Sequence, residues 1–166
     1  MKITRVLNQR GFTLVELITV LGLLAVVLLI ATPNLSALQE KVKLEADARQ
    51  LAWILRQARQ DAVFKGKPQT IFINNESEEY RWYAEGKNKT YHVSPGIDLV
   101  TSNCASYTSD GLPAYSFNTT GVPAHAGTTV LRNKQGDNRY VIVSAVIGRV
   151  RVSPDPPASW LASETY

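Results

Sequence analysis

The residues with the clearest chemistry stand near the start of the chain, where a carboxylate lies inside an apolar segment. Twenty residues run from Phe12 to Ala31, and Glu16 is the one charged side chain among them. A charge in the hydrocarbon core of a membrane is costly, and residues of this kind usually serve a function. We therefore expect Glu16 to have a specific role in a membrane.

A second group with recognisable chemistry is a set of basic residues in the last fifth of the chain. Arg149 and Arg151 are two apart, so on a strand both guanidinium groups point to the same side. The other members of the set are Arg132, Lys134 and Arg139. One acidic residue lies among these five, so the local charge is +4. Such a patch suits a phosphate backbone. The alternatives are that an edge strand carries arginine to deter aggregation, or that Arg149 and Arg151 pair with acidic residues of the head.

Catalytic and metal-binding patterns are missing from the sequence. His92 and His125 are the two histidines, and neither has the spacing of a metal site. No nucleophile elbow or Gly-rich phosphate loop occurs. Cys104 is the single cysteine, so an intrachain disulfide is excluded and a buried, inert thiol is expected. The sequence predicts a protein that is not an enzyme and holds no metal or other cofactor.

The apolar segment is long enough to cross a membrane. Twenty helical residues span roughly 30 Å, the thickness of the hydrocarbon core. Three basic residues and no acidic one precede it, so the positive-inside rule places residues 1–11 in the cytoplasm and the rest outside. A cleaved signal peptide or a plain signal anchor would leave Glu16 unexplained. We predict a single transmembrane helix over residues 12–33, in the inner (plasma) membrane.

A second helical stretch is predicted over residues 34–65. Its apolar residues are three and four apart, which is typical of a narrow apolar stripe on a helix. The stripe consists of Leu44, Ala48, Leu51, Leu55, Ala58 and Ala62. Charged residues, Asp47 among them, fall mostly on other faces. Pro33 is expected to bend the helix or, alternatively, to begin a second one, and Gly66 and Pro68 are expected to stop it.

Residues 66–152 have the composition of one β-rich globular head. Strand patterns cover residues 70–74, 80–84, 97–101, 115–118, 128–132, 139–146 and 149–152. The segments 70–74 and 80–84 flank a polar turn, which predicts a hairpin. The tail 153–166 contains three prolines and is expected to be irregular. A long helix packed on an antiparallel sheet gives an α+β fold class.

The segment Gly11 to Glu16, Gly-Phe-Thr-Leu-Val-Glu, resembles the leader motif of type IV pilins and of the pseudopilins of type II secretion. The resemblance implies that a prepilin peptidase cuts between Gly11 and Phe12 and that Phe12 becomes the N-methylated terminus. It also implies that Glu16 neutralises the new amine of a neighbouring subunit, which lowers the cost of burying either charge. The implied partners are other pilins or pseudopilins and an inner-membrane assembly platform, with the head in the periplasm or outside the cell.

The C-terminal half is similar to the closing pattern of the GspH/FimT family of minor pilins and pseudopilins. The matching segments are Tyr115–Pro123, Gly127–Leu131, Tyr140–Ser144 and Gly148–Val152. Members of the secretion branch are minor pseudopilins of a periplasmic piston that exports folded proteins. Some members of the pilus branch bind DNA during natural transformation through a Gly-Arg-x-Arg motif, which Gly148 to Arg151 fits. The resemblance implies a minor pseudopilin or, as the alternative, a minor pilin that binds double-stranded DNA through the basic set.

Removal of the leader would change the charge balance of the chain. The full chain has 18 basic and 14 acidic residues, and the leader contains three basic residues and no acidic one. The mature chain is therefore almost neutral, with 15 basic against 14 acidic side chains. Its overall charge will not attract a polyanion, so only a local patch could do so.

Overall fold

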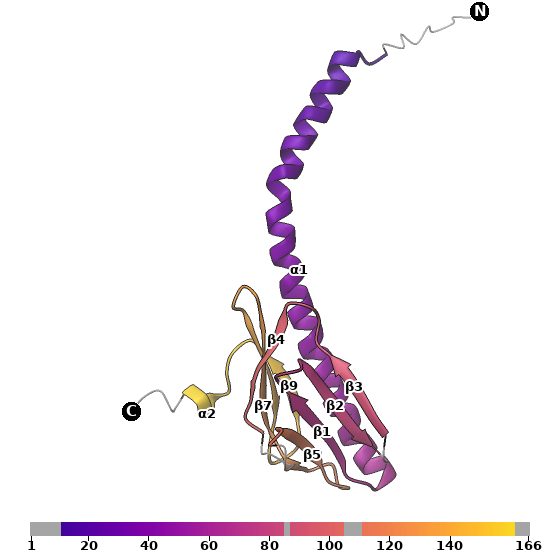
Figure 1. Ribbon diagram of the computed structural model, residues 1–166, viewed down its shortest axis with the longest axis vertical. Coiled ribbons are helices and arrows are strands. Elements are labelled where there is room, and N and C mark those ends of the chain that lie inside the picture. Colours follow the sequence, from indigo (N-terminus) through magenta and orange to yellow (C-terminus); the bar gives the residue numbers. More distant parts are fainter. Residues whose placement is uncertain (1–10, 85–86, 105–110, 162–166) are drawn as a thin grey trace, which may run out of the picture. The chain divides into compact units, whose positions relative to one another are not determined.

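The computed structural model describes residues 11–84, 87–104 and 111–161. The chain forms two compact units, Met1–Ala37 and Leu38–Tyr166. Helix α1 (Leu14–Lys65) contributes to both units, while the strands and the short helix α2 (Ala158–Leu161) belong to the second (Figure 1). The apolar segment and the head thus lie in separate units.

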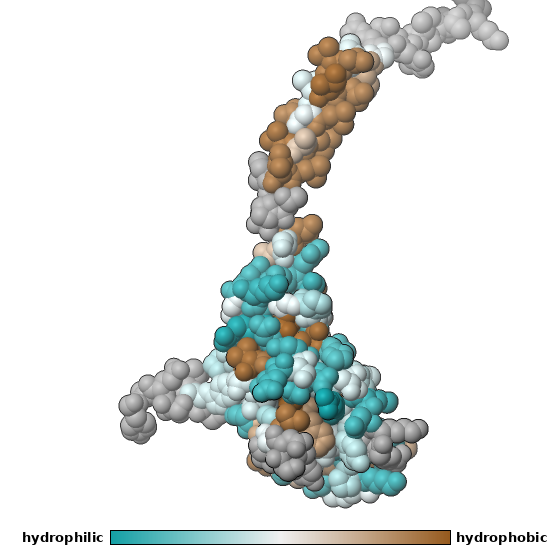
Figure 2. Space-filling model, viewed as in Figure 1, coloured by the Kyte–Doolittle hydropathy of each residue, from teal (hydrophilic) through white to brown (hydrophobic). Residues whose placement is uncertain are grey.

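The first unit presents an apolar helical surface. Thr13 caps the start of α1, because the backbone N–H of Glu16 donates to Thr13 Oγ1 at 3.3 Å. The large apolar side chains between Phe12 and Leu29 are exposed, and Figure 2 shows the hydrophobic colour around this part of the helix. Within the described residues, no helix meets the length and apolarity expected of a membrane span. The membrane-spanning role of residues 12–33 stays a prediction.

Helix α1 is continuous across Pro33, so this residue does not begin a separate helix. The predicted bend at Pro33 stays a prediction. At its other end α1 stops at Lys65, and Gly66 follows with a positive φ of 62°. A glycine in this left-handed conformation commonly ends a helix, because it carries no Cβ that would clash. The sequence signal for the end of the helix is therefore confirmed.

The predicted apolar stripe of α1 forms the helical side of the core in the second unit. All six stripe residues are at most 1% exposed. They share one hydrophobic cluster with strand residues such as Ile71, Phe117 and Leu131. The spacing of three and four residues therefore identified the buried face of the helix correctly.

Asp47 departs from the expected pattern, since its side chain is buried rather than placed on an outer face of α1. Its two carboxylate oxygens accept hydrogen bonds from Ser94, one from the backbone N–H at 2.8 Å and one from the hydroxyl group at 3.0 Å. These bonds offset the cost of removing the carboxylate from water. The prediction for Asp47 was wrong because a distant loop supplies its partners.

The strands of the second unit form two antiparallel sheets beside the C-terminal half of α1 (Figure 1). The first has the order β3-β2-β1-β5-β6 and comprises β1 (Gln69–Asn74), β2 (Glu79–Ala84), β3 (Lys87–His92), β5 (Ala114–Phe117) and β6 (Pro123–His125). The second has the order β4-β7-β8-β9 and comprises β4 (Ile97–Ser102), β7 (Gly127–Asn133), β8 (Asn138–Val143) and β9 (Val150–Ser153). The α+β fold class is confirmed.

The predicted hairpin is confirmed, because β1 pairs antiparallel with β2 in the register Ile73 to Tyr80. Strands β3 and β6 were not predicted. Both stand at the ends of the first sheet, where polar residues and a first-position proline are tolerated. The strand expected to reach residue 146 ends at Val143, and α2 lies in the tail that was expected to be irregular.

Candidate functional site

The predicted processing site lies at the very start of the described chain. Gly11, Phe12 and Thr13 precede α1 and are exposed, with Phe12 at 84%. Glu16 lies in the first turn of the helix, and no other charged residue occurs between it and Leu29. An exposed segment before a helix is accessible to a peptidase, and a carboxylate in the first turn interacts favourably with the helix dipole.

Arg149 and Arg151 are both exposed and flank the buried residue Val150. This alternation places the two guanidinium groups on the solvent side of the sheet edge formed by β9. Within the described part of the chain, neither arginine forms an ion pair. Their donors therefore face solvent.

Arg132 and Lys134 lie elsewhere, Arg132 near the end of β7 and Lys134 in the turn between β7 and β8. The Nε group of Arg132 donates to Asn138 Oδ1 at 2.9 Å. The aliphatic stem of Lys134 packs beside Gly96, whose added Cβ would lie 3.2 Å from it. Neither residue lines the grooves that Arg149 borders. The structure therefore does not gather the five predicted basic residues into one patch.

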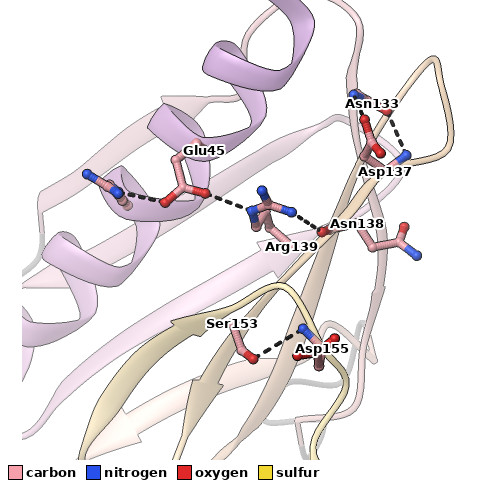
Figure 3. A network of polar contacts seen from close by, with 8 residues as sticks. Glu45, Asn133, Asp137, Asn138, Arg139, Ser153 and Asp155 are labelled. Atoms are coloured by element: carbon pink, nitrogen blue, oxygen red, sulfur yellow. Dashed lines mark hydrogen bonds and ion pairs between the residues drawn. The ribbon is translucent and has the colours of Figure 1, made fainter. Parts of the chain in front are cut away.

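Arg139 is engaged in an ion pair with α1. Its Nε group donates to Glu45 Oε2 at 2.7 Å, and Glu45 Oε1 accepts from Arg49 Nε at the same distance (Figure 3). The hydrogen bond from Arg139 is the largest cause of a lowered pKa of Glu45, which burial opposes. Arg139 therefore fastens β8 to the helix. The pairing with acidic residues that was considered for Arg149 and Arg151 is thus seen at Arg139 instead, and the DNA contact of Arg139 stays a prediction.

Two arginines of α1 lie beside β9, where the sequence had placed Arg132, Lys134 and Arg139. A groove of about 420 Å³ is lined by Glu45, Arg49 and Arg56 on the helix and by Arg149 and Arg151 on the sheet edge. Arg56 Nη2 donates to the backbone carbonyl of Val150 at 3.1 Å. Sequence reasoning placed Arg49 and Arg56 away from the apolar stripe but did not assign them to the site, although their spacing of seven residues places them on one side of a helix. The seven-residue spacing is visible in the sequence, but only the tertiary structure shows that this side of α1 lies against β9.

Gly148, the first residue of the Gly-Arg-x-Arg motif, occupies a crowded position. Its φ is +63°, and a Cβ added there would lie 2.8 Å from the backbone oxygen of Gly121. The same Gly121 oxygen accepts a hydrogen bond from Arg59 Nε at 2.9 Å. Both the left-handed backbone and the close approach require glycine. The glycine of the motif is therefore required by the structure, and the two arginines of the motif are exposed.

The residues considered for other chemistry do not form a site in the described part of the chain. No group of three or more metal-ligating side chains occurs there. His92 Nδ1 lies 3.7 Å from Glu79 Oε2 on a neighbouring strand. Cys104 is buried, and burial raises the pKa of its thiol, so the reactive thiolate is disfavoured.

Two family models match the chain. The prokaryotic N-terminal methylation motif matches residues 7–32, and the model of type II transport protein GspH matches residues 47–146. A search of curated proteins finds no match.

Two solved structures are similar to the chain, and both are crystal structures of the type IV minor pilin FimU of Pseudomonas aeruginosa strain PAO1. The crystal in space group P21 is 16% identical, with a TM-score of 0.53, and the match covers 73% of this chain and 97% of that one. The crystal in space group P65 is also 16% identical, with a TM-score of 0.50, covering 69% and 98%. At this identity the likeness shows the fold alone.

Proposed function

Because the chain belongs to the GspH family of pilin-like proteins, we propose that it is a minor subunit of a type II secretion pseudopilus. The methylation motif and the GspH model confirm the family resemblance that the sequence suggested, over residues 7–32 and 47–146. The Gly-Arg-x-Arg segment lies beyond the matched residues. The long helix and antiparallel sheets are the pilin-like fold. Membership of this family makes the chain a subunit of a type IV filament-type assembly. The finer role, in protein export, is supported by the description of the matching family.

The observation that carries the proposal is the position of Glu16. It is the one charged residue between Phe12 and Leu29, and it lies in the first turn of an otherwise apolar helical surface. A prepilin peptidase cleaves between Gly11 and Phe12, and the amine of Phe12 is then methylated. That amine in one subunit and Glu16 in the next neutralise each other within the membrane, because either charge alone would be costly there.

The partners of the chain follow from this mode of assembly. Other pseudopilins surround the apolar helix, and an inner-membrane platform adds the subunits one by one. The helix over residues 12–33 anchors the precursor in the inner membrane, with the head on the periplasmic side. The neutral balance of the mature chain, 15 basic against 14 acidic side chains, suits a role that depends on packing rather than on capture of a polyanion.

A secretion assay tests the role in export. Cells lacking the chain are expected to retain their folded exoproteins in the periplasm, and the wild-type chain should restore secretion. Glu16→Ala should fail to restore it, whereas Thr19→Ala should succeed, since the Thr19 hydroxyl group donates to backbone carbonyls of its own helix. Normal secretion in the deletion strain would contradict the proposal.

A second candidate function is contact with double-stranded DNA, which the groove beside β9 favours. Arg149 and Arg151 project into solvent there and are joined by Arg49 and Arg56 from α1. Arg49 is paired with Glu45, which also lines the groove, and the other three guanidinium groups can contact neighbouring phosphates and release counterions. Few contacts of this kind give a modest, sequence-independent affinity that falls as salt is added.

A gel-shift titration of the full chain in detergent tests this candidate at low and at physiological salt. The Arg149→Ala/Arg151→Ala variant should lose binding. Lys43→Ala/Lys89→Ala removes the same charge from exposed positions that do not line the groove, so it should bind nearly as wild type. No binding by the wild type at low salt, or equal losses in the two variants, would rule out a DNA contact at this groove.

A further inference from the structure

A larger groove lies between the C-terminal part of α1 and the turn that leads into β9. Its volume is about 1020 Å³. Besides the buried Val150, four exposed apolar side chains line it, namely Trp53, Val63, Phe64 and Ile147. Each is at least 53% exposed, and Phe64 reaches 94%. Large apolar side chains gathered in this way on a soluble surface mark interaction sites.

The same groove is cationic. Arg56, Arg59 and Arg149 line it, and no acidic side chain occurs among its described lining residues. Arg56 and Arg59 are held in place by hydrogen bonds to the backbone carbonyls of Val150 and Gly121. Each guanidinium group has five N–H donors, so these bonds leave most of the donors available to a bound partner. The charge of the groove is therefore complementary to carboxylates.

We propose that this groove binds an extended, acidic and apolar-rich segment of another protein. Trp and Arg are the residue types that dominate the binding energy of protein interfaces, and here they stand together with aliphatic side chains. Carboxylates of the partner pair with Arg56, Arg59 and Arg149, while its apolar side chains cover Trp53 and Phe64. This inference goes beyond filament assembly, since it concerns the head alone.

The spacing of the aromatic residues favours a polypeptide over a nucleic acid. Trp53 and Phe64 are eleven residues apart on α1, which is about 16 Å along the helix axis. That separation is too long for a platform on which successive bases stack. The lining between them includes the aliphatic residues Val63 and Ile147. A strand-like peptide covers the same distance with about five residues and presents side chains at every step.

Fluorescence anisotropy tests the proposal with a labelled nonapeptide that alternates Glu or Asp with Leu or Phe, added to the full chain in detergent. Saturable binding is expected, accompanied by a change in tryptophan emission as Trp53 is covered. Arg149→Glu and Phe64→Ser should each weaken binding by at least about tenfold. Lys43→Glu makes a similar charge change at an exposed position outside the groove and should leave binding unchanged.

Several outcomes would overturn the proposal. These are the absence of saturable binding, equal losses in Arg149→Glu and Lys43→Glu, and equal binding of a peptide in which lysine replaces every acidic residue. Tighter binding of single-stranded oligothymidine, sensitive to the same variants, would assign the groove to nucleic acid instead. Phe64 is almost fully exposed, so its variant keeps the fold intact. Binding is measured on unassembled chains, and therefore failure here is separate from failure of the filament proposal.

Discussion

Position 148, directly before the exposed Arg149, requires glycine. Its backbone is left-handed, and Gly121, Pro123 and Arg59 leave no room for a Cβ atom. The turn that it closes is held by two backbone hydrogen bonds, from Ser144 N–H to the Arg149 carbonyl and from Gly148 N–H to the Ser144 carbonyl. Arg149 therefore occupies a fixed position directly before β9.

We predict that Gly148→Ala destabilises the head more than Gly136→Ala does. Both glycines have positive φ, so alanine is strained at either position by about 1–2 kcal/mol. At Gly136 the space is open, whereas at Gly148 the new Cβ would meet the Gly121 oxygen at 2.8 Å. Thermal unfolding followed by near-ultraviolet circular dichroism measures the difference. Equal melting temperatures of the two variants would show that the crowding has no energetic effect.

The ion pair of Glu45 with Arg139 predicts a pH dependence of stability. The pKa of Glu45 is lowered below its ordinary value of 4.5, chiefly by the hydrogen bond from Arg139. The unfolded chain therefore binds this proton at a higher pH than the folded chain does, and the pair stabilises the fold above pH 4.5. This contribution should disappear as the pH falls through the lowered pKa of the folded state.

Glu45→Gln provides the comparison. At neutral pH the wild type should unfold at a higher temperature than Glu45→Gln, by an amount equivalent to about 1 kcal/mol, because the pair is partly exposed. Below pH 4.5 the two melting temperatures should converge. A difference that is constant from neutral to acidic pH would argue against this ion pair.

The site could be predicted from the sequence only in part. Arg149 and Arg151 lie where alternation on a strand places them, exposed on either side of Val150. Arg139 lies on the opposite side of its sheet and meets Glu45, a contact between residues far apart in the sequence. Arg56 reaches β9 through an equally long-range contact. Local periodicity identifies the face of an element, but it does not identify the element that packs against it.

At the scale of elements, α1 was predicted most accurately. The expected helix over residues 12–65 corresponds to Leu14–Lys65, because a strong apolar period and a glycine stop act locally. Strand β3 was missed, since Lys87–His92 contains no apolar alternation. Its place depends instead on main-chain pairing with β2 and on the stacking of Tyr91 on Tyr80. Tertiary pairing of this kind leaves little trace in the sequence.

The tight packing of α1 against the sheets predicts that small residues on its buried face cannot be enlarged. Ala58 is 0% exposed within the core, whereas Gln60 lies on the exposed side of the same helix. Ala58→Leu should therefore destabilise the head by about 1–3 kcal/mol, because the added methylene groups displace their neighbours. Gln60→Leu should change the melting temperature little. Thermal unfolding of the two variants checks this, and equal stability would contradict the packing described for α1.

At the scale of the whole molecule, the chain combines an apolar unit and a folded head, Met1–Ala37 and Leu38–Tyr166. The first unit provides the proposed anchoring and assembly, and the second provides surfaces for partners. The net charge of the mature chain is close to zero, so electrostatic attraction of a partner depends on local charged patches of the head and not on the overall charge. This arrangement agrees with membership of the GspH family.

The most direct test of the central claim is mass spectrometry of purified filaments, assembled in cells that produce either the wild-type chain or Glu16→Ala. In wild-type filaments we expect N-terminal peptides that begin at methylated Phe12. The Glu16→Ala chain should be cleaved at the same bond but be depleted from filaments by at least about tenfold, because the amine of its neighbour lacks a counter-charge. Wild-type levels of the Glu16→Ala chain, or filaments containing an intact Met1 terminus, would contradict the account.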